Sequence, residues 1–163
     1  MSRYTAQIAC QIALRRKPDE PFLDGRYSRA HSWAFDGGAV VAASSSPSVV
    51  RTPFSDPAGV DPEEALVAAL SSCHMLFFLD FAKRAGFVVD SYQDNAIGRM
   101  AARPDQRVAM SQVVLKPRIC FSGEKRPRAA DFEMLHREAH EACYIANSVN
   151  FEIRIEATAQ GLG

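Results

Sequence analysis

One long helix with an almost continuous apolar surface constrains the fold of this chain most. Asp61 is a suitable N-cap, Pro62 suits the first helical position, and Glu64 completes a capping box with Asp61. Gly86 supplies a stop signal. Apolar residues between these signals recur at steps of three and four positions, at Leu66, Leu70, Cys73, Phe77 and Phe81. We therefore predict a central, buried helix over residues 61–86.

Strand patterns precede this helix. Period-two alternation predicts a strand over residues 4–14, with Cys10 on its core face. Residues 27–35 and 39–43 flank the turn sequence Asp36-Gly37-Gly38 and are predicted to form a hairpin.

The connection into the helix, residues 44–60, is rich in Ser, Pro and Asp and shows no periodicity. A connection of this length inside a compact domain is usually functional or disordered. We expect no regular secondary structure here.

The second half of the chain predicts further strands and a second helix. Strand-like segments occupy residues 87–100 and 108–121, and residues 151–158 alternate as a closing strand. A helix is predicted over residues 129–147 from an apolar stripe at Phe132, Leu135, Ala139, Cys143 and Ala146. This order of elements predicts an α+β fold in which antiparallel sheets pack around two central helices.

Length and charge limit the classes of function. A chain of 163 residues that is 47% hydrophobic can bury one core, so we predict a single domain over residues 1–163. Lys plus Arg equals Asp plus Glu at 19 each, which leaves no basic surplus for a nucleic-acid partner. Neither a signal peptide nor an apolar run of roughly 20 residues is evident, so we expect a cytoplasmic protein without a membrane partner.

The four cysteines, Cys10, Cys73, Cys120 and Cys143, show no C-x-x-C or zinc-ligand spacing. Cys73 and Cys143 each lie on the apolar stripe of a predicted helix, so their sulfurs could face each other if the helices pack together. The alternative is an inert core role, because free cysteine is among the most buried residue types.

Two segments resemble motifs of the OsmC/Ohr family. Asp61-Pro62-Glu63, followed by Cys73 ten residues after the glutamate, resembles the segment by which these proteins enter their first core helix. Ala139-His140-Glu141-Ala142-Cys143 resembles the family's Ala-His-x-x-Cys pattern on the second helix.

The chain also departs from the family pattern around both cysteines. Cys143-Tyr144-Ile145 stands where the organic-hydroperoxide branch usually has a Cys-Pro-Tyr-like start. Ser72-Cys73-His74-Met75 replaces the commoner Ala-Cys-Phe. These departures concern the choice of substrate rather than the chemistry.

The resemblance implies an intertwined homodimer that reduces organic hydroperoxides or hydrogen peroxide. Cys73 would attack the peroxide, and Cys143 would close a disulfide with it. No cofactor is implied, and a dithiol of the lipoyl type would reduce the disulfide. The alternative is a non-catalytic member of the fold that binds an apolar ligand or senses oxidation without turnover.

A buried cysteine needs a cation to stabilise its thiolate. Lys83 and Arg84 are about 15 Å from Cys73 along the helix, too far to serve in their own chain. The resemblance favours Arg29, about eight residues before the Asp-Gly turn, and Arg51 is the alternative.

Glu63 matches the family glutamate that pairs with the arginine, and otherwise it is an ordinary first-turn acid. It lies about 15 Å from Cys73 along the helix, so a site containing both needs a long Arg bridge or a second subunit.

The histidines suggest no metal site. His136 and His140 have i, i+4 spacing but lack the H-E-x-x-H pattern. His74 follows Cys73 directly, and its side chain is expected to point about 100° around the helix, so we do not expect it to act as a base on Cys73.

Overall fold

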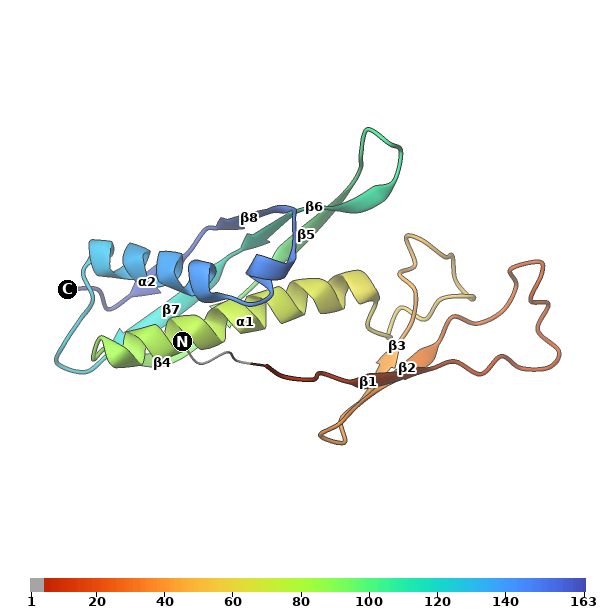
Figure 1. Ribbon diagram of the computed structural model, residues 1–163, viewed down its shortest axis with the longest axis horizontal. Helices are drawn as coiled ribbons and strands as arrows, with labels where there is room; N and C mark the ends of the chain where they lie inside the picture. Colours follow the sequence, from red (N-terminus) through yellow and green to blue (C-terminus); the bar gives the residue numbers. More distant parts are fainter. Residues whose placement is uncertain (1–4) are drawn as a thin grey trace. The chain divides into compact units, whose positions relative to one another are not determined.

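The computed structural model describes residues 5–163, and the elements are drawn in Figure 1. By internal contacts the chain divides into two compact units, Met1–Ala65 and Leu66–Gly163. Strands and two long helices follow one another without regular βαβ alternation, which confirms the predicted α+β class. The single-domain organisation stays a prediction.

A three-stranded antiparallel sheet forms the regular part of the first unit. It consists of β1 (Cys10–Ala13), β2 (His31–Phe35) and β3 (Val40–Ala43), in that order. The predicted hairpin between β2 and β3 is confirmed. The Phe35 N–H donates to the Ala39 carbonyl at 2.9 Å, and Gly38 takes the positive φ of 85° that the turn requires.

The first strand is shorter and more exposed than predicted. Tyr4, the first residue of the expected strand, lies outside the described residues, and β1 begins only at Cys10. The prediction that Cys10 is a core residue is wrong for the single chain, because every residue of β1 is exposed. Alternation identifies the faces of a strand, but a face is buried only where another layer packs on it.

The connection over residues 44–60 is irregular, as expected, and it folds back along β3. Val60 pairs with Ala43, and the buried Ser44 accepts the Asp56 N–H on its hydroxyl at 2.9 Å. A Cβ at Gly59 would lie 2.9 Å from the Ala43 carbonyl carbon, so only glycine allows this close approach.

The first helix, α1 (Pro62–Arg84), begins and ends where the sequence predicts. The Glu64 N–H donates to the Asp61 carboxylate at 2.8 Å, and the Asp61 N–H donates to the Glu64 carboxylate at 3.2 Å. This is the predicted capping box. Gly86 has a φ of 77°, and the Phe87 N–H returns to the Ala82 carbonyl at 2.9 Å, which closes the helix.

Only one stripe of α1 is fully buried, so the prediction of an entirely buried helix is wrong for the single chain. The buried stripe consists of Leu70, His74, Phe78 and Ala82. Cys73 is half-buried, and Leu76 is 61% exposed. The helix is rotated by about one residue, or 100°, from the predicted orientation, because its nearly uniform apolar surface favoured no side.

Among the described residues, α1 is the one helix whose length and composition would also allow it to cross a membrane. The core helix of a soluble protein passes the same test. The buried stripe of α1 packs against the other elements of the second unit.

The second unit contains two three-stranded sheets of mixed direction. Each predicted segment divides into two strands, and the final strands β8 and β9 pair parallel with β6 and β7, not antiparallel as expected. One sheet has the order β4 (Val88–Asp94), β7 (Pro117–Ser122) and β9 (Thr158–Gln160). The other has the order β5 (Ile97–Ala102), β6 (Val108–Leu115) and β8 (Glu152–Ile155).

Asp94 lies at the junction of the two sheets and ties it to α1. One carboxylate oxygen accepts the Lys116 backbone N–H at 2.6 Å, in the single residue between β6 and β7. The other accepts the Ser71 hydroxyl of α1 at 2.5 Å. This carboxylate therefore links the middle of α1 to the residue that separates β6 from β7.

The second helix, α2 (Ala129–Ala142), is shorter than predicted. Arg128 is the N-cap residue, and its backbone N–H donates to the Asp131 carboxylate at 3.0 Å. Cys143 is the C-cap, with extended backbone angles (φ −64°, ψ 115°), and the short 3₁₀ helix η1 (Ala146–Ser148) follows. Cys143 therefore lies just beyond the helix rather than within it.

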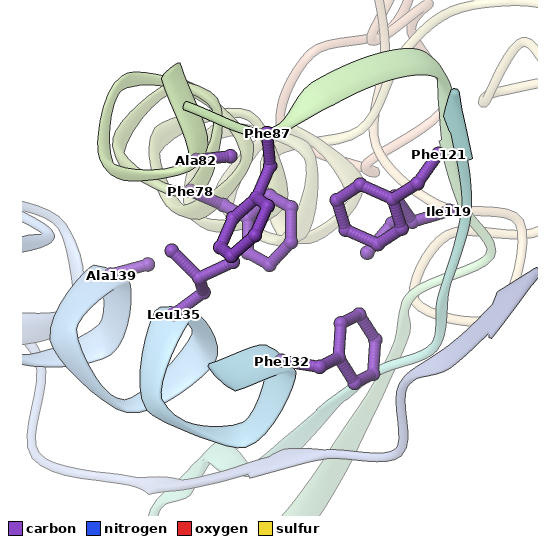
Figure 2. Close-up of a cluster of buried hydrophobic side chains, with 8 residues drawn as sticks. All are labelled: Phe78, Ala82, Phe87, Ile119, Phe121, Phe132, Leu135 and Ala139. Carbon is purple, nitrogen blue, oxygen red and sulfur yellow. The ribbon is translucent and has the colours of Figure 1, made fainter. Parts of the chain in front are cut away.

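The core of the second unit comprises two clusters. The first lies between α1, α2 and β7, and Figure 2 shows its aromatic rings in contact between the two helices and the strand; it consists of Phe78, Ala82, Phe87, Ile119, Phe121, Phe132, Leu135 and Ala139. The second surrounds the other half of α1 and consists of Leu70, Met110, Val113, Leu115 and Cys143.

Two buried histidines join the helices at the edge of the first cluster. His74 Nε2 and His136 Nδ1 are 3.0 Å apart, and the side chains are 1% and 6% exposed. Burial lowers the pKa of His74 to about 4 and that of His136 to about 3, with smaller effects from His140 and His74 respectively. Both rings are therefore neutral at neutral pH.

This pair predicts acid sensitivity of the fold. The unfolded histidines bind protons below about pH 6.5, whereas the folded ones resist protonation until about pH 4 or 3. The free energy of unfolding is therefore unaffected by these two histidines above pH 6.5, and it decreases as the pH falls towards 4, because the unfolded chain binds protons that the folded chain does not. Urea unfolding at pH 7 and pH 4 should show the free energy of unfolding of wild type falling by on the order of 6 kcal/mol more than that of the His74→Leu/His136→Leu variant, about 3 kcal/mol for each histidine. Equal losses would contradict the assignment.

Candidate active site around Cys73 and Cys143

A pocket of about 520 Å³ opens beside Cys73. Its walls come from one face of α1 and from the segment that follows α2. Asp80 is the one charged residue among those that line it, which are Ala69, Ser72, Cys73, Leu76, Phe77, Asp80, Tyr144 and Ile145. The rings of Phe77 and Tyr144 meet edge to face at 5.1 Å. The site is therefore an apolar pocket with a thiol in its wall.

Cys73 reaches this pocket because of the rotation of α1. His74 occupies the buried stripe, so the preceding residue, Cys73, lies about 100° around the helix from that stripe and remains half-buried. Ala69, Leu76, Phe77 and Asp80 lie within two turns on the same side of the helix and extend the wall.

Cys143 is fully buried in the second core cluster, against which Cys73 also packs. Burial first, and then interaction with the Cys73 thiol, raises the pKa of the Cys143 thiol to about 11; the Ala146 N–H, which donates to the sulfur at 3.4 Å, opposes the shift. The structure thus brings the two predicted cysteines together as free thiols in different surroundings.

Asp80 is held in place at the far end of the pocket wall. Its carboxylate pairs with Lys83 at 2.9 Å and with Arg84 at 2.5 Å. The hydrogen bond from Lys83, followed by the charge of Arg84, lowers the pKa of Asp80. Lys83 and Arg84 are therefore engaged two turns or more from Cys73.

Arg29, the predicted activating residue, is bound within its own unit. Its guanidinium donates to the carbonyls of Gly25 at 2.6 Å and Tyr27 at 2.5 Å, and it lies 3.7 Å from the centre of the Tyr27 ring. Its backbone N–H donates to Phe54 at 2.8 Å. These contacts give the guanidinium a defined position in a half-buried loop.

The alternative arginine and the predicted glutamate are less constrained. Arg51 is exposed and lies 6.0 Å from the centre of the Phe54 ring. Glu63 is half-buried in the first turn of α1. Within residues 5–163 neither Arg29 nor Arg51 forms an ion pair with Glu63, so the predicted fork is not formed inside the single chain.

No group of three or more His, Cys, Asp or Glu residues in the described part of the chain could hold a metal ion. His140, the i+4 neighbour of His136, does not join the histidine pair.

Sequence reasoning missed three of the residues that line the pocket. Asp80 follows Cys73 by seven positions, a two-turn spacing that would have placed it on the same side of α1. Tyr144 and Ile145 directly follow Cys143, but the predicted continuation of the helix would have sent their side chains elsewhere.

Comparisons with known proteins agree with this architecture. A family model described as OsmC-like protein matches residues 55–158. An OsmC-like protein of unknown function from Vibrio cholerae is 46% identical, with a TM-score of 0.92 over 94% of this chain and all of that one. No curated protein matches the chain significantly.

More distant structures share the fold. An organic hydroperoxide resistance protein from Elizabethkingia anophelis has a TM-score of 0.68 at 15% identity, over 98% of this chain and 99% of that one. The organic hydroperoxide resistance protein OhrB of Bacillus subtilis has a TM-score of 0.60 at 14% identity, over 94% of this chain and all of that one.

The two thiols should differ sharply in reactivity. With its pKa raised to about 11, Cys143 is about one part in a thousand thiolate at pH 8, and it is fully buried. Brief treatment of the reduced protein with iodoacetamide should label Cys73 at least about tenfold faster, as measured by mass spectrometry of the peptides. The denatured protein, in which both should label alike, is the control. Equal labelling of the folded protein would contradict the assignment.

Proposed function

This chain belongs to the OsmC-like protein family, and on that premise we propose that it is a thiol-dependent peroxidase of organic hydroperoxides. The observation that carries the proposal is the pairing of a thiol in the wall of an apolar pocket, Cys73, with a buried thiol beside it, Cys143. The organic hydroperoxide resistance proteins of the same fold support it by their names.

In the first step, the Cys73 thiolate attacks the outer oxygen of the hydroperoxide. The O–O bond breaks and an S–O bond forms, and the departing alkoxide takes a proton from solvent to leave as an alcohol. The sulfur is oxidised to a sulfenic acid while the peroxide is reduced.

In the second step, the Cys143 sulfur attacks the sulfenic acid. The S–O bond breaks, an S–S bond forms, and the hydroxide leaves as water with the proton of the Cys143 thiol. The raised pKa of Cys143 supports this order, because a protonated thiol does not compete for the peroxide. A dithiol of the lipoyl type then reduces the disulfide by two thiol–disulfide exchanges.

The pocket favours a substrate with an apolar body. Leu76, Phe77, Tyr144 and Ile145 would contact such a body while its peroxide group meets Cys73. Hydrogen peroxide would gain nothing from these contacts, so the proposal ranks organic hydroperoxides first.

Thiolate formation needs a cation, and we assign this role to Arg29, held by Glu63, with Arg51 as the alternative. Because the fork is not formed within one chain, the proposal places it in a homodimer of about 36 kDa, twice the chain mass of 17.9 kDa, with the active site shared between subunits. Such a thiol pair would operate in the cytoplasm, where thiols are kept reduced.

A second candidate function is ligand binding or oxidation sensing without turnover. The apolar pocket, the substituted sequence around Cys143 and the absence of an ion pair for Arg29 in the described chain favour it. Steady-state peroxide consumption with a lipoyl reductant separates the two. Oxidation of one equivalent without turnover would select the sensor.

The two cysteines should separate into attacking and resolving roles. Cys143→Ser should consume one equivalent of cumene hydroperoxide and keep Cys73 as a sulfenic acid, detectable with a dimedone probe. Cys73→Ser should consume essentially none. The Cys120→Ser variant should behave as wild type and serves as the control. Equal reactivity of the Cys73 and Cys143 variants would overturn the assignment.

Substitutions of Arg29 and Arg51 should have different effects on the rate of the first reaction with peroxide. Arg29→Ala should slow the first reaction with peroxide at pH 7 by about tenfold or more, because the charge that stabilises the attacking thiolate is removed. Arg51→Ala should change it little, and Arg29→Lys should restore part of the rate. Stopped-flow measurement of peroxide consumption checks this. If only Arg51→Ala slows the reaction, Arg51 rather than Arg29 would be the residue that stabilises the thiolate.

A further inference from the structure

The buried histidine pair lies beside both cysteines in sequence and between the two segments that carry them. His74 directly follows Cys73 on α1, and His136 lies on α2, seven residues before Cys143, which is the C-cap of that helix. Among the hydrogen bonds of the described residues, His74–His136 is the one that joins a side chain of α1 to a side chain of α2.

The surroundings of the pair are apolar. The His136 ring lies 4.5 Å from the Phe78 ring and 4.7 Å from the Phe132 ring, centre to centre. The planes of the two imidazoles are nearly parallel, 2° apart, and the ring centres are 5.3 Å apart. Their outer nitrogens, His74 Nδ1 and His136 Nε2, are buried and form no hydrogen bond with another of the residues that the structure describes.

Stability does not account for this arrangement. A buried polar atom without a partner is unfavourable, and each ring carries one. Two leucines of similar size would fill the same space without that cost, since replacing both partners of a buried polar pair by apolar groups is often neutral or stabilising.

A polar pair in an apolar seam can instead fix how two helices are aligned. Apolar side chains alone allow neighbouring registers of similar energy, whereas a hydrogen bond forms in one of them. In the register seen here, Cys73 packs against the cluster that contains Cys143, and the two thiols interact.

We infer that the His74–His136 hydrogen bond sets the register of α1 against α2 and thereby holds Cys73 and Cys143 in position for their disulfide. Both histidines are positioning residues, because His74 points away from the pocket and His136 contacts His74 and aromatic rings. The inference rests on the proposed function only because that function is what gives the Cys73–Cys143 disulfide its purpose.

The experiment measures closure of the disulfide without peroxide. The protein is equilibrated with oxidised and reduced glutathione, so that two thiols and one oxidised glutathione give one protein disulfide and two reduced glutathiones. Mass spectrometry quantifies the Cys73–Cys143 peptide. For His74→Leu/His136→Leu we expect the equilibrium constant for closure to fall about tenfold, the equivalent of one hydrogen bond. Unfolding of the reduced double variant at pH 7 should be unchanged or require more urea.

The control variant is His136→Asn, whose side-chain amide can bond to His74 from the position of Nδ1. Closure should stay within about threefold of wild type for Asn and fall about tenfold for the single His136→Leu variant. The inference is overturned if the double Leu variant closes the disulfide with the same equilibrium constant as wild type. It is also overturned if Asn and Leu at position 136 lower that constant equally. Failure of the double variant to fold would make the pair a requirement of the core, and would overturn it too.

The same experiment separates this inference from the proposed function. Wild type that closes the disulfide with glutathione but does not consume peroxide would refute the peroxidase and leave the role of the histidines intact. Wild type that closes no disulfide between Cys73 and Cys143 would overturn both.

Discussion

The packing of one stripe of α1 determines the rest of the second unit. Leu70, His74, Phe78 and Ala82 face the core, and the rings around Phe78 fill the space between α1, α2 and β7, as Figure 2 shows. Because a helix presents its neighbouring positions about 100° apart, burial of His74 leaves Cys73 at the wall of the pocket. The site is therefore a consequence of how the core is filled.

The two cysteines lie in different surroundings. Cys73 meets the pocket, while Cys143, at the end of α2, is enclosed by the second cluster and has its pKa raised by burial. Asp94 accepts hydrogen bonds from both the Ser71 hydroxyl and the Lys116 backbone, and so links the middle of α1 to the residue between β6 and β7.

Local signals in the sequence predicted local structure well, and long-range packing only in part. The capping box of Asp61 and Glu64 and the stop at Gly86 depend on neighbouring residues, and they are as predicted. The stripe of α1 was misplaced because a helix that is apolar nearly all round carries little information about which side is buried. Parallel pairing of β8 and β9 could not be predicted from alternation, which is the same for either direction. The predicted pairing of Arg29 with Glu63 is not formed within the described residues of the single chain.

The position of Cys143 beyond the last turn of α2 links the buried sulfur to the protein surface. Its sulfur accepts the Ala146 N–H at 3.4 Å, and Ala146 begins the short helix η1, whose Asn147 and Ser148 are exposed. A sulfur drawn towards Cys73 withdraws this acceptor, so the amide of Ala146 would exchange its hydrogen with water at a different rate in the two oxidation states. A single backbone amide would thus report from the surface whether the buried thiol is free or bonded.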